Sequence, residues 1–232
     1  MYSRDNIIEQ GLRGVLHLLY PDLCAGCGSE EVLRNQLICL DCIANLPLTG
    51  FFNHSTNPVE KLFRGRINIE SAAAYVYFTK QSSMQHLLHQ LKYKGNKEVG
   101  LYFGRKMGAA MKSGTIYNDI EALLPLPLYY QREKRRGYNQ AAIICEGIAE
   151  VTGAQVLYDV VERKVKTETQ TQKNRNERWQ NIEGKFSLRN KAQVMGKHVM
   201  LVDDVLTTGA TLEACGAELL KTENLRLSIS TL

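Results

Sequence analysis

Hydrophobic and polar positions predict that strands and helices alternate along the chain after about residue 60. In the helical stretches, apolar residues recur at three- or four-residue steps, as Met84, Leu87 and Leu91 do before Gly95. The strand stretches are short and apolar, with β-branched or aromatic residues. We predict strands at 71–79, 154–161, 197–204 and 225–232, a strand from Ile120 that ends at Pro125 and Pro127, and helices at 83–95, 99–111, 139–151 and 210–221.

This alternation predicts an α/β fold, with a parallel sheet that is covered by helices on both faces. The segment 163–183 is polar and follows no period. The first 58 residues have a different pattern, because they are rich in turn-forming residues and contain four cysteines. They predict one helix, which Pro21 ends. We therefore expect two domains, at residues 1–60 and 61–232.

Composition narrows the class of protein. A hydrophobic share of 44% and a charged share of 23% are typical of soluble globular proteins, and the formal net charge of +5 does not by itself imply a polyanionic partner. No apolar run approaches the length of a membrane span. Asp5, Glu9 and Arg13 interrupt the first segment, which favours an amphipathic helix over a secretory signal. The cytoplasm is the expected compartment.

Two adjacent acids, Asp203 and Asp204, follow the predicted strand 197–204. In parallel α/β sheets, ligands bind beyond the carboxyl ends of strands. Neighbouring carboxylates repel each other, so a divalent cation, sugar hydroxyls or water must relieve the repulsion. The threonine-rich loop that follows, 207–211, offers N–H groups and hydroxyls to an anion at the start of a helix. This pattern is that of a ribose-phosphate site.

A solvated acidic turn with Thr208 as the helix N-cap would explain an isolated acid pair. The complete string from strand to helix instead resembles the 5-phosphoribosyl-1-pyrophosphate (PRPP) motif of type I phosphoribosyltransferases. The resemblance implies that Asp203 and Asp204 hold the ribose 2′- and 3′-hydroxyls, and that the loop 207–211 holds the 5′-phosphate. The expected PRPP-binding residues are Asp203, Asp204, Val205, Leu206, Thr207, Thr208, Gly209, Ala210 and Thr211.

Thr207 narrows the chemistry further. Family members that act on hypoxanthine or guanine typically carry an aspartate at this position, which acts as acid or base toward the purine. The threonine therefore argues against transfer to a 6-oxopurine, and leaves other bases, amines or no transfer at all.

Four cysteines form two C-x-x-C pairs, Cys24 with Cys27 and Cys39 with Cys42. This spacing is typical of a structural Zn²⁺ site with four thiolate ligands. Disulfides are the alternative in an oxidising compartment, and a thioredoxin-like redox pair would be expected near a βαβ pattern that this region lacks. We predict a small zinc ribbon before the sheet.

Two basic stretches, 131–141 and 162–186, are expected to leave the carboxyl ends of neighbouring strands, on the same side of the sheet as the acid pair. They could follow a nucleic-acid backbone and stack on a base, or close over pyrophosphate, and basic runs are also commonly just solvated. The candidate contacts are Arg132, Lys134, Arg135, Arg136, Lys173, Arg175, Arg178 and Trp179.

Taken in order, the two C-x-x-C pairs, LKYKG, LPLPL, RRGYNQA, the segment with Thr167, Gln170, Arg175 and Arg178, and LVDDVLTTGAT resemble the ComF family. These are zinc-ribbon, phosphoribosyltransferase-like proteins associated with DNA uptake in naturally transformable bacteria. The family usually has a small Gly-Ala turn before its last strand, where this chain has Thr222–Asn224. The resemblance implies a PRPP-binding fold, Mg²⁺ and a link to single-stranded DNA.

Three functions follow from this resemblance. The protein could be an accessory factor that helps a DNA-translocating ATPase move incoming single-stranded DNA. It could be a phosphoribosyltransferase that acts on a nitrogen nucleophile, although no catalytic residue can be named. It could also be a regulator that senses PRPP without turnover. The fold often pairs, so a homodimer is compatible with each.

Overall fold

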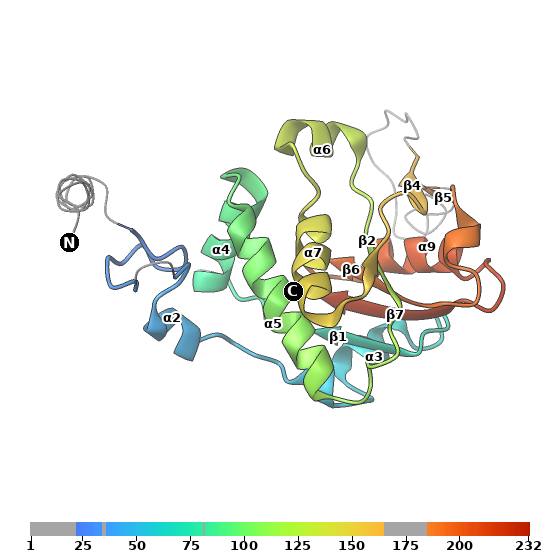
Figure 1. Cartoon of the computed structure of the whole chain (residues 1–232), viewed down its shortest axis with the longest axis horizontal. Coiled ribbons are helices and arrows are strands. Elements are labelled where there is room, and N and C mark those ends of the chain that lie inside the picture. Colours follow the sequence, from blue (N-terminus) through green and yellow to red (C-terminus); the bar gives the residue numbers. More distant parts are fainter. Residues whose placement is uncertain (1–21, 34–35, 81, 165–184) are drawn as a thin grey trace, which may run out of the picture.

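The structure is a computed structural model that describes residues 22–33, 36–80, 82–164 and 185–232 (Figure 1). The helix expected before Pro21 lies outside these residues. The α-helices are α2 (Leu40–Ala44), α3 (Pro58–Phe63), α4 (Ser83–Tyr93), α5 (Lys97–Ser113), α6 (Tyr130–Arg136), α7 (Gln140–Thr152) and α9 (Ala210–Leu219). The strands are β1 (Ser71–Ala74), β2 (Ala122–Pro125), β3 (Gln155–Val156), β4 (Val161–Arg163), β5 (Phe186–Leu188), β6 (His198–Asp203) and β7 (Arg226–Thr231).

Five strands form one parallel sheet in the order β1-β7-β6-β2-β3. β6 lies at its centre and pairs with β7 along its whole length, from His198 opposite Arg226 to Asp203 opposite Thr231. A parallel neighbour can be reached only through a crossover, and helices supply these crossovers. The predicted α/β fold is confirmed.

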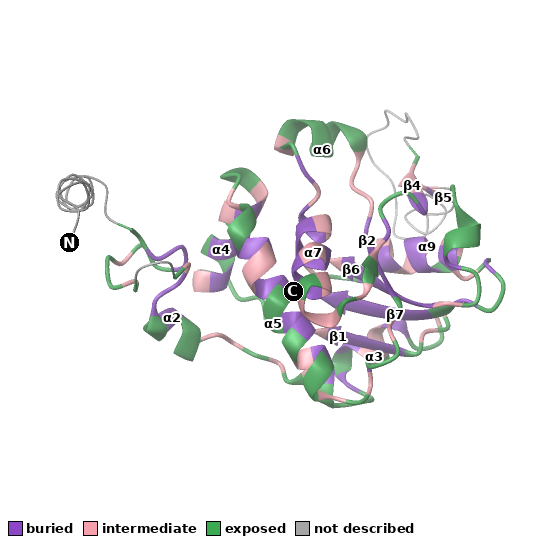
Figure 2. Ribbon diagram, in the orientation of Figure 1, coloured by how far each residue is buried: buried purple, intermediate pink, exposed green. Residues whose placement is uncertain are grey.

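Both faces of the sheet are covered, because alternate side chains of each strand enter different cores. Met200 and Val202 pack with α4, α5 and α7 on one face, whereas Val199 and Leu201 pack with α3 and α9 on the other. Figure 2 shows the strands as buried along most of their length. The acid pair is thereby held at the end of a fully enclosed strand.

Helices α5 and α7 cross so closely that glycine is required at the contact. A Cβ added at Gly104 would lie 2.3 Å from the carbonyl oxygen of Ile144, and one at Gly147 would lie 2.5 Å from that of Leu101. Real Cβ atoms do not approach a backbone oxygen this closely, so a larger residue would force the helices apart. This contact fixes the layer of helices that supports α6 and the loop before it.

Two predicted strands differ from the observed ones. The parallel strand 71–79 ends at Ala74, where its pairing with β7 stops, and Val76 beyond it forms an isolated antiparallel bridge with Leu48 instead. The apolar run 154–161 divides into β3, in the main sheet, and β4, which pairs antiparallel with β5. Apolar character predicts a buried strand but does not say with which partner it pairs.

Three of the described helices, α2, α3 and α6, were not predicted from the hydrophobic pattern, and α2 has only five residues. α6 contains no buried residue, so it has no apolar stripe for a period to reveal (Figure 2). α3 has only six residues, which is too short for a period, although Asn57 before Pro58 is a typical helix start. The Asn57 side chain accepts hydrogen bonds from the N–H groups of Val59 and Glu60 at 2.9 and 3.1 Å.

Candidate functional site

The acid pair lies at the carboxyl end of the central strand. Asp203 is the last residue of β6, and Asp204 begins the loop toward α9. The neighbouring strand β2 ends at Pro125, and its continuation stays beside β6 because Leu126 N–H donates to the Val202 carbonyl at 2.8 Å. The loops after β2 and β6 therefore leave the same edge of the sheet, which is where parallel α/β sheets bind ligands.

The two carboxylates have different surroundings. Asp204 forms an ion pair with Lys92 of α4, whose Nζ is 2.9 Å from Oδ1, and its backbone N–H donates to Asp203 Oδ1 at 2.8 Å. Burial, followed by the charge of Asp204, raises the pKa of Asp203 to about 7. The sequence analysis named a cation, hydroxyls or water as relief for the repulsion. In the structure Lys92 provides part of that relief, from a helix that is distant along the chain.

A second cation faces the pair from β4. Arg163 is half-buried, and its guanidinium lies 5.5 Å from the ring centre of Phe186 and 5.9 Å from that of Tyr129. Burial, followed by the charge of Arg132, lowers the pKa of Arg163, and the charge of Asp203 opposes this shift. Sequence reasoning did not select Arg163, because nothing in the local sequence says that β4 turns back toward β6.

The threonine loop has a conformation that requires glycine. Gly209 is the N-cap of α9 with φ of 72°, and a Cβ there would lie 3.0 Å from the ring of Phe63. Thr207 and Thr208 are exposed, and Thr208 Oγ1 accepts from Ala210 N–H at 3.5 Å. The predicted alternative of Thr208 as the N-cap is therefore wrong, since Gly209 occupies that position.

Arg66 holds the loop in place from the chain after α3. Its Nη1 donates to the Thr208 carbonyl at 3.3 Å, and its Nη2 is 2.5 Å from Oε2 of Glu213 in the first turn of α9. The loop carbonyl is thus turned toward Arg66, which leaves the exposed threonine hydroxyls available to a ligand at the positive end of the helix.

The first basic stretch forms α6 (Figure 1), which follows the carboxyl end of β2 as predicted, and β2 runs parallel to β6, which ends in Asp203. Arg132, Lys134 and Arg135 are exposed. Arg136 instead lies with its guanidinium 5.3 Å from the ring centre of Tyr93, at the end of α4. The structure thereby adds Tyr93, which is 59% exposed, to the basic surface.

The second basic stretch leaves a different strand from the one expected. It begins in β4, which belongs to the two-stranded antiparallel ribbon with β5 rather than to the main sheet. The expectation that it leaves a neighbouring strand of the main sheet is therefore wrong. Four of the candidate contacts lie outside the described residues, namely Lys173, Arg175, Arg178 and Trp179.

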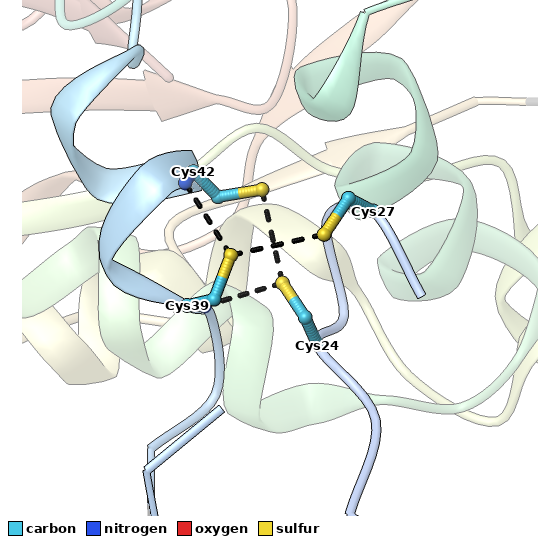
Figure 3. A group of neighbouring side chains, drawn as sticks. All are labelled: Cys24, Cys27, Cys39 and Cys42. Atoms are coloured by element: carbon cyan, nitrogen blue, oxygen red, sulfur yellow. Dashed lines mark hydrogen bonds between the residues drawn. The ribbon is translucent and has the colours of Figure 1, made fainter. Parts of the chain in front are cut away.

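The four cysteines of the two C-x-x-C pairs converge (Figure 3). Their Sγ atoms all lie within 4.8 Å of one another, with 3.7 Å between Cys24 and Cys42 and 3.7 Å between Cys27 and Cys39. Disulfide sulfurs are about 2.0 Å apart, so these are free thiols. Four thiolates at this spacing could bind a metal ion such as zinc.

Backbone N–H groups point at these sulfurs, as metal-binding knuckles require. Cys39 N–H donates to Cys24 Sγ at 3.2 Å, and Cys42 N–H donates to Cys39 Sγ at 3.5 Å. Burial opposes ionisation of Cys24, but hydrogen bonds from the backbone of Cys39, Cys27 and Gly26 outweigh it and lower the pKa of Cys24 to about 6. Cys24 is thus prepared to lose its proton to a metal, whereas burial, followed by hydrogen bonds with the other cysteines, raises the pKa of Cys42.

The cysteine module is joined to the acid pair through α4. Gln90 Nε2 donates to the carbonyl of Ala25 at 2.7 Å, and a His86 ring nitrogen lies 3.3 Å from the carbonyl of Gly26. Lys92, which pairs with Asp204, follows Gln90 by two residues on the same helix. The helix that carries Lys92 is therefore in direct contact with the cysteine module.

No helix among the described residues is long and apolar enough to cross a membrane. This agrees with the absence of a long apolar run in the sequence.

Comparison with known proteins gives one domain match and several full-length relatives. Residues 134–231 match the phosphoribosyl transferase domain family. The chain is 28% identical to "Competence protein F" of Haemophilus influenzae over 204 residues, which cover 86% of this chain and 85% of the relative. It is 30% identical to "DNA utilization protein YhgH" of Salmonella typhi over 217 residues, which cover 88% and 93% respectively.

Among solved structures, the chain is similar to the glutamine phosphoribosylpyrophosphate amidotransferase of B. subtilis. The sequence identity is 16%, the TM-score is 0.42, and the match covers 62% of this chain and 30% of that one.

Proposed function

Because the chain belongs to the ComF family of competence and DNA utilization proteins, we propose that it binds PRPP and serves as an accessory factor in the handling or uptake of single-stranded DNA during natural transformation. The observation that carries the PRPP part is the placement of Asp203 and Asp204 at the end of β6, directly before the threonine loop and the first turn of α9. Carboxylates accept hydrogen bonds from sugar hydroxyls, and the helix start favours a phosphate.

In this proposal each part of the site has a role. Asp203 and Asp204 accept from the ribose 2′- and 3′-hydroxyls, and the loop 207–211 binds the 5′-phosphate. Mg²⁺ would accompany the pyrophosphate, since hard oxygen ligands are those that it prefers. Arg163 adds a positive charge near Asp203, where it would offset part of the ligand's negative charge.

Calorimetric titration with PRPP and Mg²⁺ tests this site. We expect the wild-type chain to bind, and the double variant Asp203→Ala/Asp204→Ala to release no heat of binding, because it removes all acceptors for the ribose hydroxyls. A wild-type chain that binds no PRPP, or a double variant that binds it equally well, would contradict the proposal.

We also propose that the metal of the cysteine module is Zn²⁺ with a structural role. Tetrahedral Zn–S bonds of about 2.3 Å place neighbouring sulfurs about 3.8 Å apart. The separations of 3.7 Å between Cys24 and Cys42 and between Cys27 and Cys39 match this spacing. All four ligands come from the protein, which would leave no open position for a substrate.

For the DNA part of the proposal, the supporting feature is a surface that we call the α4–α6 patch. It consists of exposed side chains from the end of α4 and from α6, namely Tyr93, Lys94, Arg132, Lys134 and Arg135. Cations that follow a phosphate backbone, next to an aromatic ring for a base, are the usual elements of single-strand binding. Its α6 part follows β2, which runs parallel to β6, and its α4 part follows Lys92, which pairs with Asp204.

Measuring the affinity for a labelled single-stranded oligonucleotide at several salt concentrations distinguishes the contribution of the α6 cations from that of the Tyr93 ring. The triple variant Arg132→Ala/Lys134→Ala/Arg135→Ala should flatten the plot of log affinity against log salt by about 2, since each phosphate contact in a single strand contributes about 0.7. Tyr93→Ala should lower the affinity about tenfold at every salt concentration and leave the slope unchanged, because stacking releases no counterions.

The matched control replaces three exposed lysines outside the α4–α6 patch by alanine, namely Lys106, Lys112 and Lys191. It removes the same net charge, so any general effect of charge appears in both triple variants. If the plot of log affinity against log salt had the same slope for the patch variant and for this control, the assignment of DNA contacts to α6 would be contradicted.

A second candidate is transfer of the phosphoribosyl group to a nitrogen nucleophile other than a 6-oxopurine, with regulation by PRPP sensing as a third. The exposed, uncharged Thr207 at the loop favours these over 6-oxopurine transfer. Pyrophosphate release, measured with a panel of bases and amines, distinguishes the transferase from the two roles without turnover. Release with any acceptor favours the transferase. No release with any acceptor, despite clear PRPP binding, favours the accessory or sensing role.

The names of the relatives, which mention competence and DNA utilization, support the DNA part of the proposal. We further propose that the protein works in the cytoplasm with a DNA-translocating ATPase, alone or as a homodimer. The boundary at residue 60 between the two expected domains stays a prediction.

A further inference from the structure

A cavity of about 660 Å³ lies between the cysteine module and α4. One wall consists of residues 22–28 of the module, and the other includes His89 and Gln90 of α4, with Lys94 and Asn96 after them. Sites for small organic groups typically have volumes of about 300–1,000 Å³. Because Lys94 also belongs to the α4–α6 patch, the cavity adjoins the proposed DNA surface.

Contacts between three planar side chains link α6 to this cavity. The Arg136 guanidinium lies 5.3 Å from the centre of the Tyr93 ring, and the centre of the His89 ring lies 5.0 Å from that of Tyr93. His89 in turn lines the cavity. Tyr93 and His89 are both exposed, so their rings offer faces on which successive bases of a strand can stack.

Hydrogen bonds fix the amide groups of the cavity wall. Gln90 Nε2 donates to the Ala25 carbonyl at 2.7 Å, and Asn96 Nδ2 donates to Gln90 Oε1 at 2.8 Å. Asn96 Oδ1 accepts no hydrogen bond from the residues that the structure describes, so it is available to an N–H group of a ligand. Unstacked bases present N–H groups of this kind on their Watson–Crick edges.

The charges around the cavity favour a strand over a free nucleotide. Among the described lining residues, Lys94 and Asp22 are the only lysine, arginine or acidic side chains. The lining therefore has no surplus of these cations for the terminal phosphate of a free nucleotide, which carries nearly two negative charges. A strand needs none inside the cavity, because its phosphates can follow Lys94 and the cations of α6 while a neutral base enters.

Building on the proposed single-stranded DNA surface, we infer that this cavity receives an unstacked base of the strand. The strand crosses α6 and the Tyr93 ring with its phosphates on the cations, and one base turns past His89 into the cavity. There Asn96 Oδ1 accepts a hydrogen bond from the edge of the base. The cysteine module thereby takes part in DNA binding, because its residues 22–28 form the wall against which the base lies.

Fluorescence anisotropy with the full chain tests the cavity with two labelled single strands of equal length. One is oligothymidine, and the other has the same deoxyribose-phosphate backbone without bases. We expect the wild-type chain to bind oligothymidine at least tenfold more tightly than the abasic strand. The variant His89→Ala should bind oligothymidine about tenfold more weakly than the wild type and bind the abasic strand equally well, because the lost ring contacts bases only.

The matched control is His54→Ala, since His54 is also an exposed histidine but lies outside the cavity and the α4–α6 patch. It should change neither affinity. Thermal unfolding of both variants verifies that each is folded, and binding of the abasic strand verifies that the phosphate contacts are intact.

Photo-crosslinking with 4-thiothymidine in the oligonucleotide locates the base. We expect cross-links to residues 22–28 of the module as well as to α4. A base that stacks on Tyr93 alone would cross-link to α4 and not to the module.

Each outcome decides. The cavity would be overturned by equal affinities of the wild type for the two strands, by equal losses of both in His89→Ala, or by cross-links that spare residues 22–28. A wild-type chain that binds neither strand would overturn the DNA surface itself, and the cavity with it.

Discussion

Replacing Asp203 by asparagine should stabilise the folded protein above neutral pH and, at the same time, weaken PRPP binding about 100-fold. Asp203 lies in a buried position next to the charge of Asp204, and these two effects raise its pKa to about 7. A neutral amide has no charge to bury and none to repel. It also keeps only one of the two acceptor oxygens, and hydrogen bonds to a charged group contribute about 1.5–3 kcal/mol each.

The direction of this stability effect follows from how many protons the folded and unfolded states bind. An aspartate in the unfolded chain has a pKa of about 3.9, so between pH 4 and 7 the folded protein keeps a proton that the unfolded chain has lost. Stability contributed by this group is therefore complete below pH 4 and is lost as the pH rises through 7. The asparagine variant does not suffer that loss, so its advantage in the free energy of unfolding should grow from pH 4 to 7 and then level off at about 4 kcal/mol.

Urea unfolding at pH 4.5, 6 and 8.5 measures the stability effect, and PRPP titration at pH 8 measures the binding effect. Asp159→Asn is the control, because Asp159 is exposed and its substitution should change neither quantity. If Asp203→Asn were less stable than the wild type at pH 8.5, the carboxylate would not be the buried, repelled group that the structure indicates.

Removing the metal of the cysteine module should unfold that module and weaken PRPP binding several-fold. Structural Zn²⁺ contributes about 10–16 kcal/mol to small zinc-binding folds, far more than the apolar contacts of a segment this short. Without it, Ala25 and Gly26 would no longer hold Gln90 and His86 of α4 in place. Lys92 would then be less firmly placed against Asp204, and the repulsion within the acid pair would grow.

Hydrogen exchange before and after chelation should show faster exchange in residues 22–33 and 36–45 and in α4, with the central strands still protected. Cys42→Ala and Cys145→Ala form a matched pair, since both cysteines are buried but only Cys42 belongs to the cysteine module. Cys42→Ala should lower the metal content and reproduce the exchange pattern, whereas Cys145→Ala should retain the metal. Unchanged exchange in α4 after metal loss would refute the link between the module and the acid pair.

Short sequence patterns predicted the structure correctly where it depends on interactions between residues that are close in sequence. The string from Val199 to Thr211 predicted a strand, an acid pair and a helix in the correct order, because burial, charge and helix start all act within a few residues there. The spacing of Cys24, Cys27, Cys39 and Cys42 likewise predicted that the four sulfurs meet, since each tight turn brings two of them together. The Gly-bounded helix α4 was predicted for the same reason.

The surroundings of these motifs could not be predicted in the same way. Lys92 on α4 and Arg163 on β4 both face the acid pair, yet each reaches it through the packing of elements that are far apart in sequence. Tyr77 and Phe78 looked like the end of a strand, but pairing with β7 stops at Ala74, the chain turns to an antiparallel bridge between Val76 and Leu48, and these rings line a cavity.

By itself, the sequence determined which groups the protein carries for a sugar phosphate and for a metal, because hydrogen-bonding and ligand types follow from residue identity and short spacing. Only the tertiary structure decided which cations lie against the acid pair, how the cysteine module supports them, and what lies beside the loop. These depend on how the strands are ordered in the sheet and on how the helices pack, and that arrangement results from the burial of the two cores as a whole rather than from any single segment.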